Sequence, residues 1–264
     1  MNELPIALTV AGSDSGGGAG IQADLKVFFA LGCHGTSALT ALTAQNTMGV
    51  TGIHEVPPEF VTLQIDAIAD DMGIDAAKTG MLSSAPIIET VAAAFAKLEV
   101  PLVVDPVFVS KHGDKLLADD AVDALRERLF PLASVVTPNL HEASALVGFD
   151  IENTADMKRA AQALVAMGAE TALVKGGHLP GDRAVDVYYD GSTYEELEGP
   201  RYDTEDTHGT GCALSAAIAA GLAKGDDRLG SIRAAKDFVS GAIRESLRIG
   251  RGYGPVNIGW RFGR

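Results

Sequence analysis

The sequence predicts an α/β fold with a central, mostly parallel β-sheet and flanking helices. The first observation is that short apolar segments alternate with longer segments whose apolar residues recur at helical spacing. The second is that loops rich in glycine and polar residues directly follow the apolar segments. Such alternation implies right-handed βαβ units and parallel strands. Because no linker, repeat or change of composition interrupts it, we expect one domain over residues 1–264, with residues 255–264 as an irregular C-terminal tail.

The first half of the chain supplies the start of this alternation. An apolar strand at residues 6–11 leads into the glycine-rich loop of residues 12–20. Ile21, Leu25 and Phe28 have helical spacing and predict a helix over residues 21–31. Pro58 suits the first turn of a later helix. The other elements expected here are strands at 36–43, 52–56 and 76–79, and helices at 58–72 and 85–98.

The second half continues the pattern and interrupts it with a hairpin. Asp190 and Gly191 form a tight-turn signal between two strand-like segments, so we expect those strands to pair antiparallel. Thr154 is a candidate helix N-cap. The elements expected in this half are strands at 102–104, 134–137, 171–175, 184–189 and 193–198, and helices at 119–129, 141–146, 154–167, 211–224 and 229–247.

The composition fits a globular protein and excludes several kinds of partner. Of 264 residues, 47% are hydrophobic, which is enough for a sizeable core. The formal net charge of −14 argues against binding to nucleic acid or an anionic membrane surface, although a local site could still hold phosphate. The N-terminal residues lack the basic stretch of a secretory signal, and no apolar run approaches the ~20 residues of a membrane span. Two distant cysteines, Cys33 and Cys212, indicate a reducing, cytoplasmic location.

Polar residues follow the predicted strands where an α/β sheet binds its ligands. Asp105, Asn139 and Glu142 come just after two of these strands, and Lys175 ends a third. Oxygen ligands converging at one sheet edge suit Mg²⁺, which binds through one or two carboxylates and substrate phosphates. The alternative is that Asp105 and Asn139 are cap or turn residues, that Glu142 is a solvated first-turn residue, and that Lys175 is a surface lysine.

The segment Gly209-Thr210-Gly211-Cys212 begins a helix of small residues. Backbone N–H groups at a helix N-terminus bind anions, and they lower the pKa of a first-turn thiol. We therefore expect an anion hole with an accessible thiolate at Cys212. Two other interpretations exist: Cys212 is a small buried capping residue, or it forms a Cys–His hydrolase dyad with His208. The first glycine-rich loop matches neither the dinucleotide-binding fingerprint nor the P-loop, and by itself it equally suits a tight turn.

Seven segments together resemble the ribokinase-like superfamily, and within it the hydroxymethylpyrimidine/phosphomethylpyrimidine kinases of thiamin biosynthesis. Each segment alone is a weak signal, but their combination in this order is highly specific and spans nearly the whole chain. The resemblance implies a three-layer αβα fold. The segments are AGSDSGGGAGIQADLK (11–26), TALTAQNT (40–47), KTGML (78–82), VVDPV (103–107), VTPNLHEA (136–143), VKGGH (174–178) and DTHGTGCALSAAIA (206–219).

The resemblance implies an ATP- and Mg²⁺-dependent kinase. Its substrate would be 4-amino-5-hydroxymethyl-2-methylpyrimidine, converted to the monophosphate and then to the pyrophosphate. Carried over by position, Gln45 would bind the pyrimidine edge, and Gly12, Asp24 and Met81 would line the same pocket. Glutamine suits an aminopyrimidine because its amide offers both a donor and an acceptor.

The phosphate side is assigned in the same way. Asp105 and Glu142 would hold Mg²⁺, and the residues serving ATP would be Asn139, Glu142, Lys175 and Thr210. Gly209, Gly211 and Cys212 would form the anion hole, with Cys212 as the base where most of the superfamily has aspartate.

The resemblance also leaves alternatives. The main one is a pyridoxal or pyridoxine kinase of the same superfamily, against which Gln45 and Met81 favour the pyrimidine. A catalytically silent binding protein is disfavoured by the intact Gln45, Glu142 and Cys212. Relatives are commonly homodimers, and a monovalent cation and the second phosphorylation stay open. Phe108 and His112 depart from the pattern of relatives, and the segment beyond Asn257 has no counterpart in it.

Overall fold

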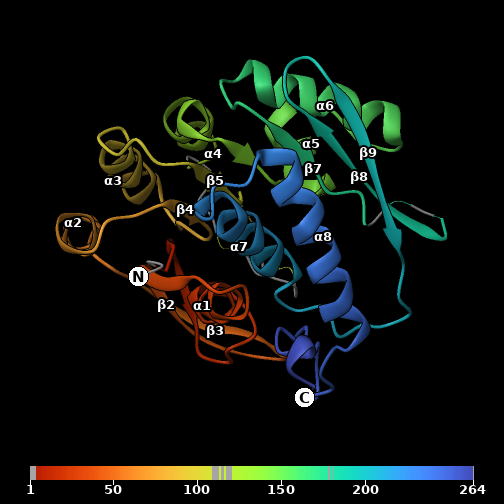
Figure 1. The fold of residues 1–264 in the computed structure, drawn as a ribbon, viewed down its shortest axis with the longest axis horizontal. Helices are drawn as coiled ribbons and strands as arrows, with labels where there is room; N and C mark the ends of the chain where they lie inside the picture. The colour runs from red at the N-terminus through yellow and green to blue at the C-terminus, as the bar shows by residue number, and fades with distance from the viewer. Residues whose placement is uncertain are drawn as a thin grey trace.

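A computed structural model describes residues 4–108, 113, 116, 121–177, 179 and 181–263. Its centre is a nine-stranded sheet in the order β3-β2-β1-β4-β5-β6-β7-β8-β9 (Figure 1). The pairs from β2 to β7 are parallel, whereas β3, β8 and β9 pair antiparallel. The strands are β1 (Ile6–Asp14), β2 (His34–Asn46), β3 (Gly49–Glu55), β4 (Ala76–Thr79), β5 (Leu102–Val104), β6 (Val135–Val136), β7 (Ala172–Val174), β8 (Arg183–Tyr189) and β9 (Tyr194–Pro200).

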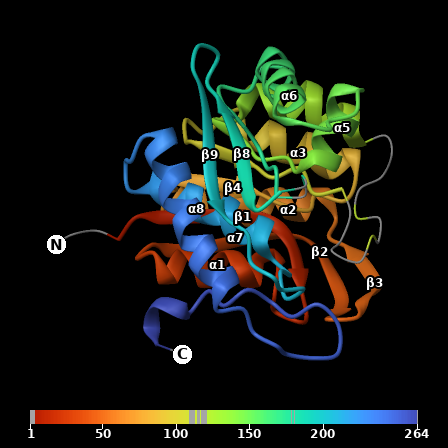
Figure 2. The same cartoon turned by 90° about the vertical axis from the view of Figure 1, so that its right-hand side faces the viewer.

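Helices cover both faces of this sheet, as the sequence predicted. Helices α1, α7 and α8 pack on one face of the sheet and form one apolar cluster with it. The five helices α2, α3, α4, α5 and α6 form a second apolar cluster with the other face (Figure 2). The strands alternate between the clusters: Val103 packs with the first, while Leu102 and Val104 pack with the second. The helices are α1 (Gly20–Ala30), α2 (Pro58–Asp71), α3 (Ala85–Phe95), α4 (Ala121–Ala124), α5 (Leu140–Val147), α6 (Thr154–Ala166), α7 (Thr210–Ala223) and α8 (Arg228–Arg244).

Most element boundaries differ from the expectation by one to three residues, and two regions differ in their structure. The first strand continues to Asp14, because β1 still pairs with β2 after a register shift between Ala11 and Ser13. The helix expected over residues 119–129 is described only from Ala121. Its first four described residues form α4, which continues directly into the π-helical turn Leu125–Leu129. Residues 119 and 120 lie outside the described part of the chain. A 3₁₀ turn, Phe130–Leu132, then leads to β6.

The C-terminal segment is irregular but integral to the core. Pro255 pairs with His208, and Val256 and Ile258 are buried. A 3₁₀ turn spans Trp260–Phe262, and the Trp260 indole donates to the carbonyl of Phe238 on α8. The tail therefore holds the loop before α7 against the rest of the molecule. In the described residues we find no helix with the length and hydropathy of a membrane span.

Candidate active site

Charged side chains meet at the carboxyl ends of β5 and β7. Asp105 follows β5, and its Oδ1 lies 3.0 Å from the Nζ of Lys175, the residue after β7. We call this ion pair the outer pair, because 16% of the Lys175 side chain is exposed. Thr137 also donates to Asp105 Oδ1, at 3.1 Å. Burial alone would raise the pKa of Asp105, but the charges of Lys175 and Lys78 hold it below its usual value.

Asn139 and Glu142 form the capping box of α5. Asn139 Oδ1 accepts the Glu142 N–H at 2.9 Å, and Glu142 Oε2 accepts the Asn139 N–H at 2.7 Å. The side-chain oxygen of Asn139 is therefore engaged as a cap, which was its alternative interpretation. Glu142 is not the solvated residue of the alternative, because it is only 4% exposed. Burial raises its pKa to about 7; Lys175 opposes this shift and the negative charge of Asp105 adds to it.

The donor set around the outer pair fits Mg²⁺ bound jointly with phosphates. Asp105 and Glu142 are two buried carboxylates whose charges repel, and a divalent cation near them would relieve that repulsion. In the described part of the chain, no cluster of three or more His, Cys, Asp or Glu residues could bind a metal alone. Two carboxylates completed by phosphate oxygens match the usual coordination of Mg²⁺ in kinases.

The N-terminus of α7 closes the other side of this region. Gly209 is its N-cap with φ of +82°, and a Cβ there would lie 1.9 Å from the carbonyl oxygen of Gly18. Only glycine fits this contact, which joins the first loop to α7. Gly211 faces the outer pair, since a Cβ on it would lie 3.4 Å from Lys175 Nζ. The first N–H groups of α7 and Lys175 thus offer donors and positive charge to one region.

Cys212 lies in the first turn of α7 and is partly exposed. Burial raises the pKa of its thiol to about 11, although the charge of Lys78 and a backbone hydrogen bond from Gly20 oppose the shift. The expected lowering of this pKa is wrong, because desolvation outweighs the helix terminus. The Cys–His dyad finds no support either: His208 Nε2 is bound to Asp14 Oδ2 at 3.0 Å.

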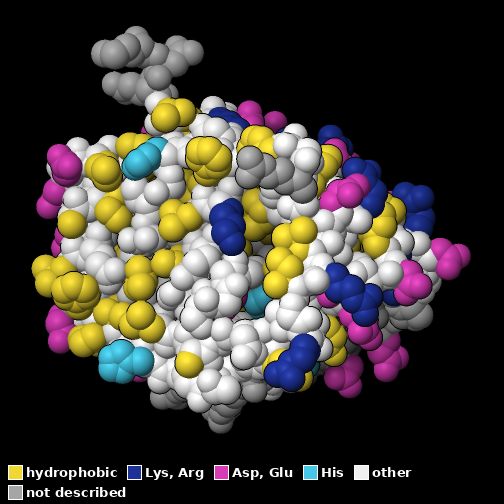
Figure 3. Space-filling model, turned by 90° about the horizontal axis from the view of Figure 1, so that it is seen from below, with side chains coloured by type: hydrophobic (Ala, Val, Ile, Leu, Met, Phe, Trp, Pro, Cys, Tyr) yellow, Lys and Arg dark blue, Asp and Glu magenta, His cyan; other side chains and the backbone are white. Residues whose placement is uncertain are grey.

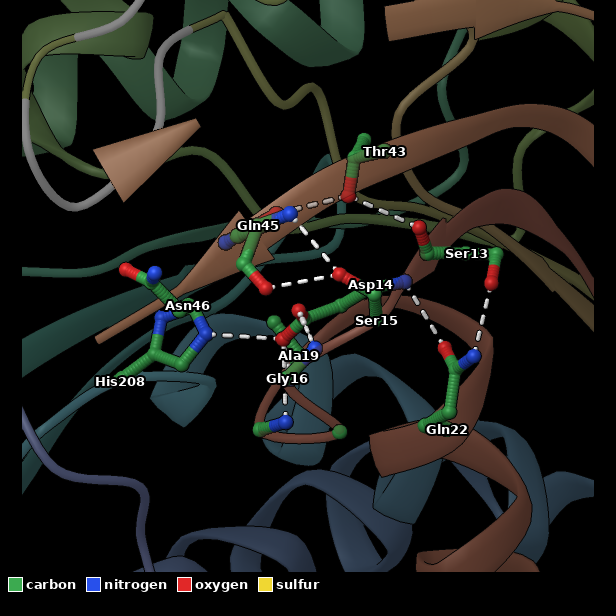
Figure 4. Close-up of polar contacts among 12 residues, drawn as sticks. Ser13, Asp14, Ser15, Gly16, Ala19, Gln22, Thr43, Gln45, Asn46 and His208 are labelled. Carbon is green, nitrogen blue, oxygen red and sulfur yellow. Dashed lines mark hydrogen bonds and ion pairs between the residues drawn. The ribbon is translucent and has the colours of Figure 1, made fainter. Parts of the chain in front are cut away.

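Asp14 organises the first glycine-rich loop (Figure 4). Its carboxylate accepts the N–H groups of Gly16, Gly18 and Ala19 at 2.7, 3.0 and 2.8 Å, in addition to His208. Burial raises the pKa of Asp14, but these hydrogen bonds outweigh it and hold the pKa below its usual value. The loop is therefore rigidly shaped rather than a flexible glycine run.

The residues expected around the pyrimidine are only partly together. Gly12 faces Met81, because a Cβ on Gly12 would lie 3.2 Å from Met81 Sδ. Gln45 is on β2, where Thr43 donates to its Oε1 at 3.1 Å, and Ser15 bonds both its backbone groups (Figure 4). The structure therefore brings Gln45 to the first loop, and its contact with the pyrimidine edge stays a prediction.

Asp24 differs from the expectation of a pocket-lining group. Its side chain is 0% exposed, and Oδ2 lies 3.1 Å from Lys78 Nζ and 2.7 Å from Thr9 Oγ1. We call Asp24 and Lys78 the inner pair. Burial raises the pKa of Asp24, and Lys78 offsets only part of this.

Sequence reasoning missed Lys78 and Asp14, although both stand in the motifs that it singled out. A lysine within an otherwise apolar strand segment and an acidic residue within a glycine-rich loop were the available signals. Of the two departures from the family pattern, Phe108 is buried in the core. His112 lies outside the described residues.

Known proteins resemble this chain along nearly its whole length. The phosphomethylpyrimidine kinase family model matches residues 14–257. The hydroxymethylpyrimidine/phosphomethylpyrimidine kinase of Streptomyces coelicolor is 55% identical over 98% of this chain and 96% of its own length. Among solved structures, Bacillus subtilis pyridoxal kinase with ADP has a TM-score of 0.93 at 42% identity, covering 99% of this chain and 100% of that one.

A second solved structure carries the name that the motifs predicted. Phosphomethylpyrimidine kinase from Clostridium difficile has a TM-score of 0.81 at 40% identity, with coverage of 91% of this chain and 100% of that one. Together with the sheet order and the two helical layers, these similarities confirm the three-layer ribokinase-like fold. The chain belongs to the phosphomethylpyrimidine kinase family.

Proposed function

We propose that this protein transfers the γ-phosphoryl group of ATP to the hydroxymethyl group of 4-amino-5-hydroxymethyl-2-methylpyrimidine. We further propose that it then phosphorylates the resulting monophosphate to the pyrophosphate used for thiamin. The observation that carries this proposal is the junction of two unlike regions. A cationic region formed by Lys175 and the α7 N-terminus adjoins the first loop, where Gly12, Met81 and Gln45 offer apolar and amide contacts.

The residues of the cationic region suit phosphoryl transfer. Such reactions pass through a loose transition state, so positioning and charge neutralisation supply most of the catalysis. Lys175 and the first N–H groups of α7 would bind the transferring phosphoryl oxygens, with Thr210 beside the nucleotide. Asp105 and Glu142 would hold Mg²⁺, which would supply further neutralisation of phosphate charge when bound.

Cys212 would accept the proton of the acceptor hydroxyl. Its raised pKa means that the thiol is mostly protonated at neutral pH. In a loose transition state the hydroxyl loses its proton late, so the demand on the base is small. The thiol must nevertheless give up its own proton before it can accept another, and the groups that ease this ionisation matter to the rate.

Product analysis tests the proposal. The protein is incubated with ATP, Mg²⁺ and the hydroxymethylpyrimidine, and products are separated by anion exchange and identified by mass spectrometry. We expect the monophosphate first and the pyrophosphate later, with ADP formed in equal amount at each step. Absence of pyrimidine phosphate while ATP stays intact would overturn the assignment.

A pyridoxal kinase activity is the second candidate. The high structural similarity to a protein named pyridoxal kinase favours it. Both reactions use the same cationic region, so the ring pocket decides between them. ADP formation is compared with equal concentrations of the pyrimidine and pyridoxal, and a higher kcat/KM for pyridoxal would make this second candidate the main activity.

We also propose that the protein is a cytoplasmic homodimer. Both Cys33 and Cys212 are free thiols, which suits a reducing compartment. Apolar side chains are exposed around the β2–β3 edge and α2, and Figure 3 has hydrophobic surface on the side where α2 lies in Figure 1. The exposed apolar residues of this surface are Leu42, Ile53, Phe60 and Leu63. For a dimer, light scattering after gel filtration should give twice the chain mass of 27.4 kDa.

A further inference from the structure

Lys78 is a fully buried lysine that the proposed reaction does not yet use. It lies in β4, and its side chain and that of its partner Asp24 are both 0% exposed. Taking two charges out of water costs several kcal/mol per ion, and a buried pair of this kind is weak evidence for stability. A packed apolar pair would serve the core at least as well, so the charge of Lys78 needs another explanation.

The hydrogen bonding of the inner pair is incomplete. Asp24 Oδ2 receives both Lys78 Nζ and Thr9 Oγ1, at 3.1 and 2.7 Å. The other oxygen, Oδ1, is buried and has no hydrogen-bond partner in the described part of the protein. A pair kept only for stability would be expected to satisfy both oxygens, since an unpartnered buried acceptor costs about 1–3 kcal/mol.

The inner pair lies beside the first turn of α7. Gly20 and Asp24 are one helical turn apart on α1; Gly20 makes a backbone hydrogen bond to the Cys212 thiol, and Asp24 binds Lys78. Gly80, just after β4, leaves room for the ammonium, since a Cβ on Gly80 would lie 3.0 Å from Lys78 Nζ. β4, which carries Lys78, packs against α7, which carries Cys212. At this position the charge of Lys78 lowers the pKa of the Cys212 thiol, against the effect of burial.

We propose that Lys78 is a positioning residue whose buried charge stabilises the thiolate of Cys212, and that Asp24 holds the ammonium in place for this purpose. The negative charges of Asp24 and Asp105 raise the pKa of the thiol, whereas the charge of Lys175 and the Gly20 N–H act with Lys78 to lower it. Lys78 differs from Lys175 in that no ligand can reach it. Its charge is therefore present at Cys212 whether or not phosphates are bound.

Cys212 gains and loses one proton in each turnover. Cys212 releases its thiol proton to solvent, and the thiolate is stabilised by Lys78. The thiolate then takes the proton of the acceptor hydroxyl as that oxygen bonds to the γ-phosphorus and the bond to the ADP oxygen breaks. ADP and the phosphorylated product leave, and the thiol is ready to lose its proton again. This order of proton transfers rests on the proposed function, but the effect of Lys78 on the Cys212 thiol does not.

The test measures the reactivity of the Cys212 thiol in the absence of any substrate. The rate of Cys212 alkylation by iodoacetamide is followed by peptide mass spectrometry from pH 7 to 9 in the wild type, Lys78→Met and Asp24→Asn. Below the thiol pKa the rate follows the thiolate fraction, so each unit of pKa changes it about tenfold. Lys158→Met is the matched control, because Lys158 pairs with Glu196 on the exposed surface.

Slower alkylation in Lys78→Met without slower alkylation in Asp24→Asn would support the proposal. We expect Lys78→Met to slow alkylation about tenfold at every pH, Asp24→Asn not to slow it, and Lys158→Met to leave it unchanged. A merely structural role would loosen the site in both inner-pair variants and speed alkylation in both. An unchanged or faster rate in folded Lys78→Met, or a shift in the same direction in both variants, would overturn the proposal.

A double variant covers the case in which Lys78→Met does not fold. Asp24→Asn/Lys78→Met leaves no unpaired charge in the core, and circular dichroism checks its fold. Because the loss of Lys78 outweighs the loss of Asp24 at the thiol, we expect alkylation to slow at least threefold. An unchanged rate in this variant would reduce Lys78 to a structural residue. Product analysis of the wild type is independent of these rates, so failure of the proposed function would be recognised separately.

Discussion

Two lysine–aspartate pairs flank the first turn of α7, and they differ in their access to ligands. The inner pair, Lys78–Asp24, is 0% exposed on both sides. The outer pair, Lys175–Asp105, has nearly the same separation, 3.0 Å against 3.1 Å, but 16% of the Lys175 side chain is exposed. The two ion pairs therefore have nearly equal N–O distances but different environments: the inner pair is closed to solvent, and the outer pair faces the site.

The difference in exposure implies a difference in role. In the proposed function, the outer lysine would exchange its carboxylate for phosphate oxygens when a nucleotide binds, and its charge would then act on the transferring group. The inner lysine keeps one partner and acts only through space. With these proposed roles, the site would separate a charge that moves to the bound substrate from a charge that is fixed, and removing one lysine at a time tests this separation.

The largest effect is expected from the outer lysine. Lys175→Met should lower kcat about 10³-fold, roughly 4 kcal/mol, because it removes the mobile charge that would stabilise the transferring phosphoryl group. Its stability should also fall, because the variant leaves the buried Asp105 carboxylate without its closest ion-pair partner. Steady-state kinetics and urea unfolding measure both quantities. Lys175→Arg retains the charge and should recover part of kcat; a kcat within threefold of wild type in Lys175→Met would remove Lys175 from the site.

The next largest effect concerns Glu142, which adjoins the outer pair. Its folded pKa is about 7, above an unfolded value of about 4.3, so the folded state binds more protons between these values. Stability should therefore fall as pH rises from about 4 to 7, by roughly 3 kcal/mol in total. Urea unfolding without divalent cations at pH 5 and pH 8 measures this loss.

Glu142→Gln isolates the contribution of that carboxyl. Glutamine cannot ionise but keeps an oxygen that can accept the Asn139 N–H, so the α5 cap should survive. We expect the variant to lose less stability than wild type between the two pH values. Parallel pH profiles for the two proteins would mean that Glu142 does not titrate near neutrality. Mg²⁺ added to wild type at pH 8 should restore stability, because it binds the folded carboxylates.

The sequence predicted the architecture better than it predicted the charges. Alternating apolar segments are enough to place most of the strands, because a buried parallel strand needs an apolar run. The same reasoning placed Asp105, Glu142 and Lys175 at one edge of the sheet, since all three follow strands. It failed for the Cys212 pKa, because the helix terminus is visible in the sequence while the desolvation by packed neighbours is not.

Long-range pairs were likewise beyond the sequence. Nothing in the first loop shows that Asp14 meets His208, which is 194 residues away. The inner pair joins residues 54 positions apart on different elements. Asp24 was expected to face the substrate, and only the tertiary structure shows that it contacts a buried lysine. Motifs identify the residues that matter, whereas their partners follow from the tertiary fold.

Cys212, whose thiol is affected by the charges of both pairs, should have the third-largest effect. Cys212→Ala should lower kcat about 10²-fold, because a positioned base contributes at least this much to proton transfer. Pyrimidine affinity should stay within twofold, since alanine retains the small side chain of the first turn. Isothermal titration with the pyrimidine and steady-state kinetics separate these quantities. Near-normal turnover would contradict the role of Cys212 as base, and any effect of Lys78 on the thiol would then have no part in turnover.

The smallest effect is expected at Gln45, whose described hydrogen bonds involve neither lysine–aspartate pair. Its amide oxygen is bound by Thr43 and its backbone by Ser15, so it belongs to the first-loop region rather than the charged one. Gln45→Ala should raise the KM for the pyrimidine about tenfold, the value of about one neutral hydrogen bond, roughly 1.4 kcal/mol. The kcat should be unchanged, because no charge near the phosphoryl group is altered. A fall in kcat as large as the rise in KM would contradict this expectation. It would mean that binding of the ring also positions the charged groups, so that the first loop and the two lysine–aspartate pairs do not act independently.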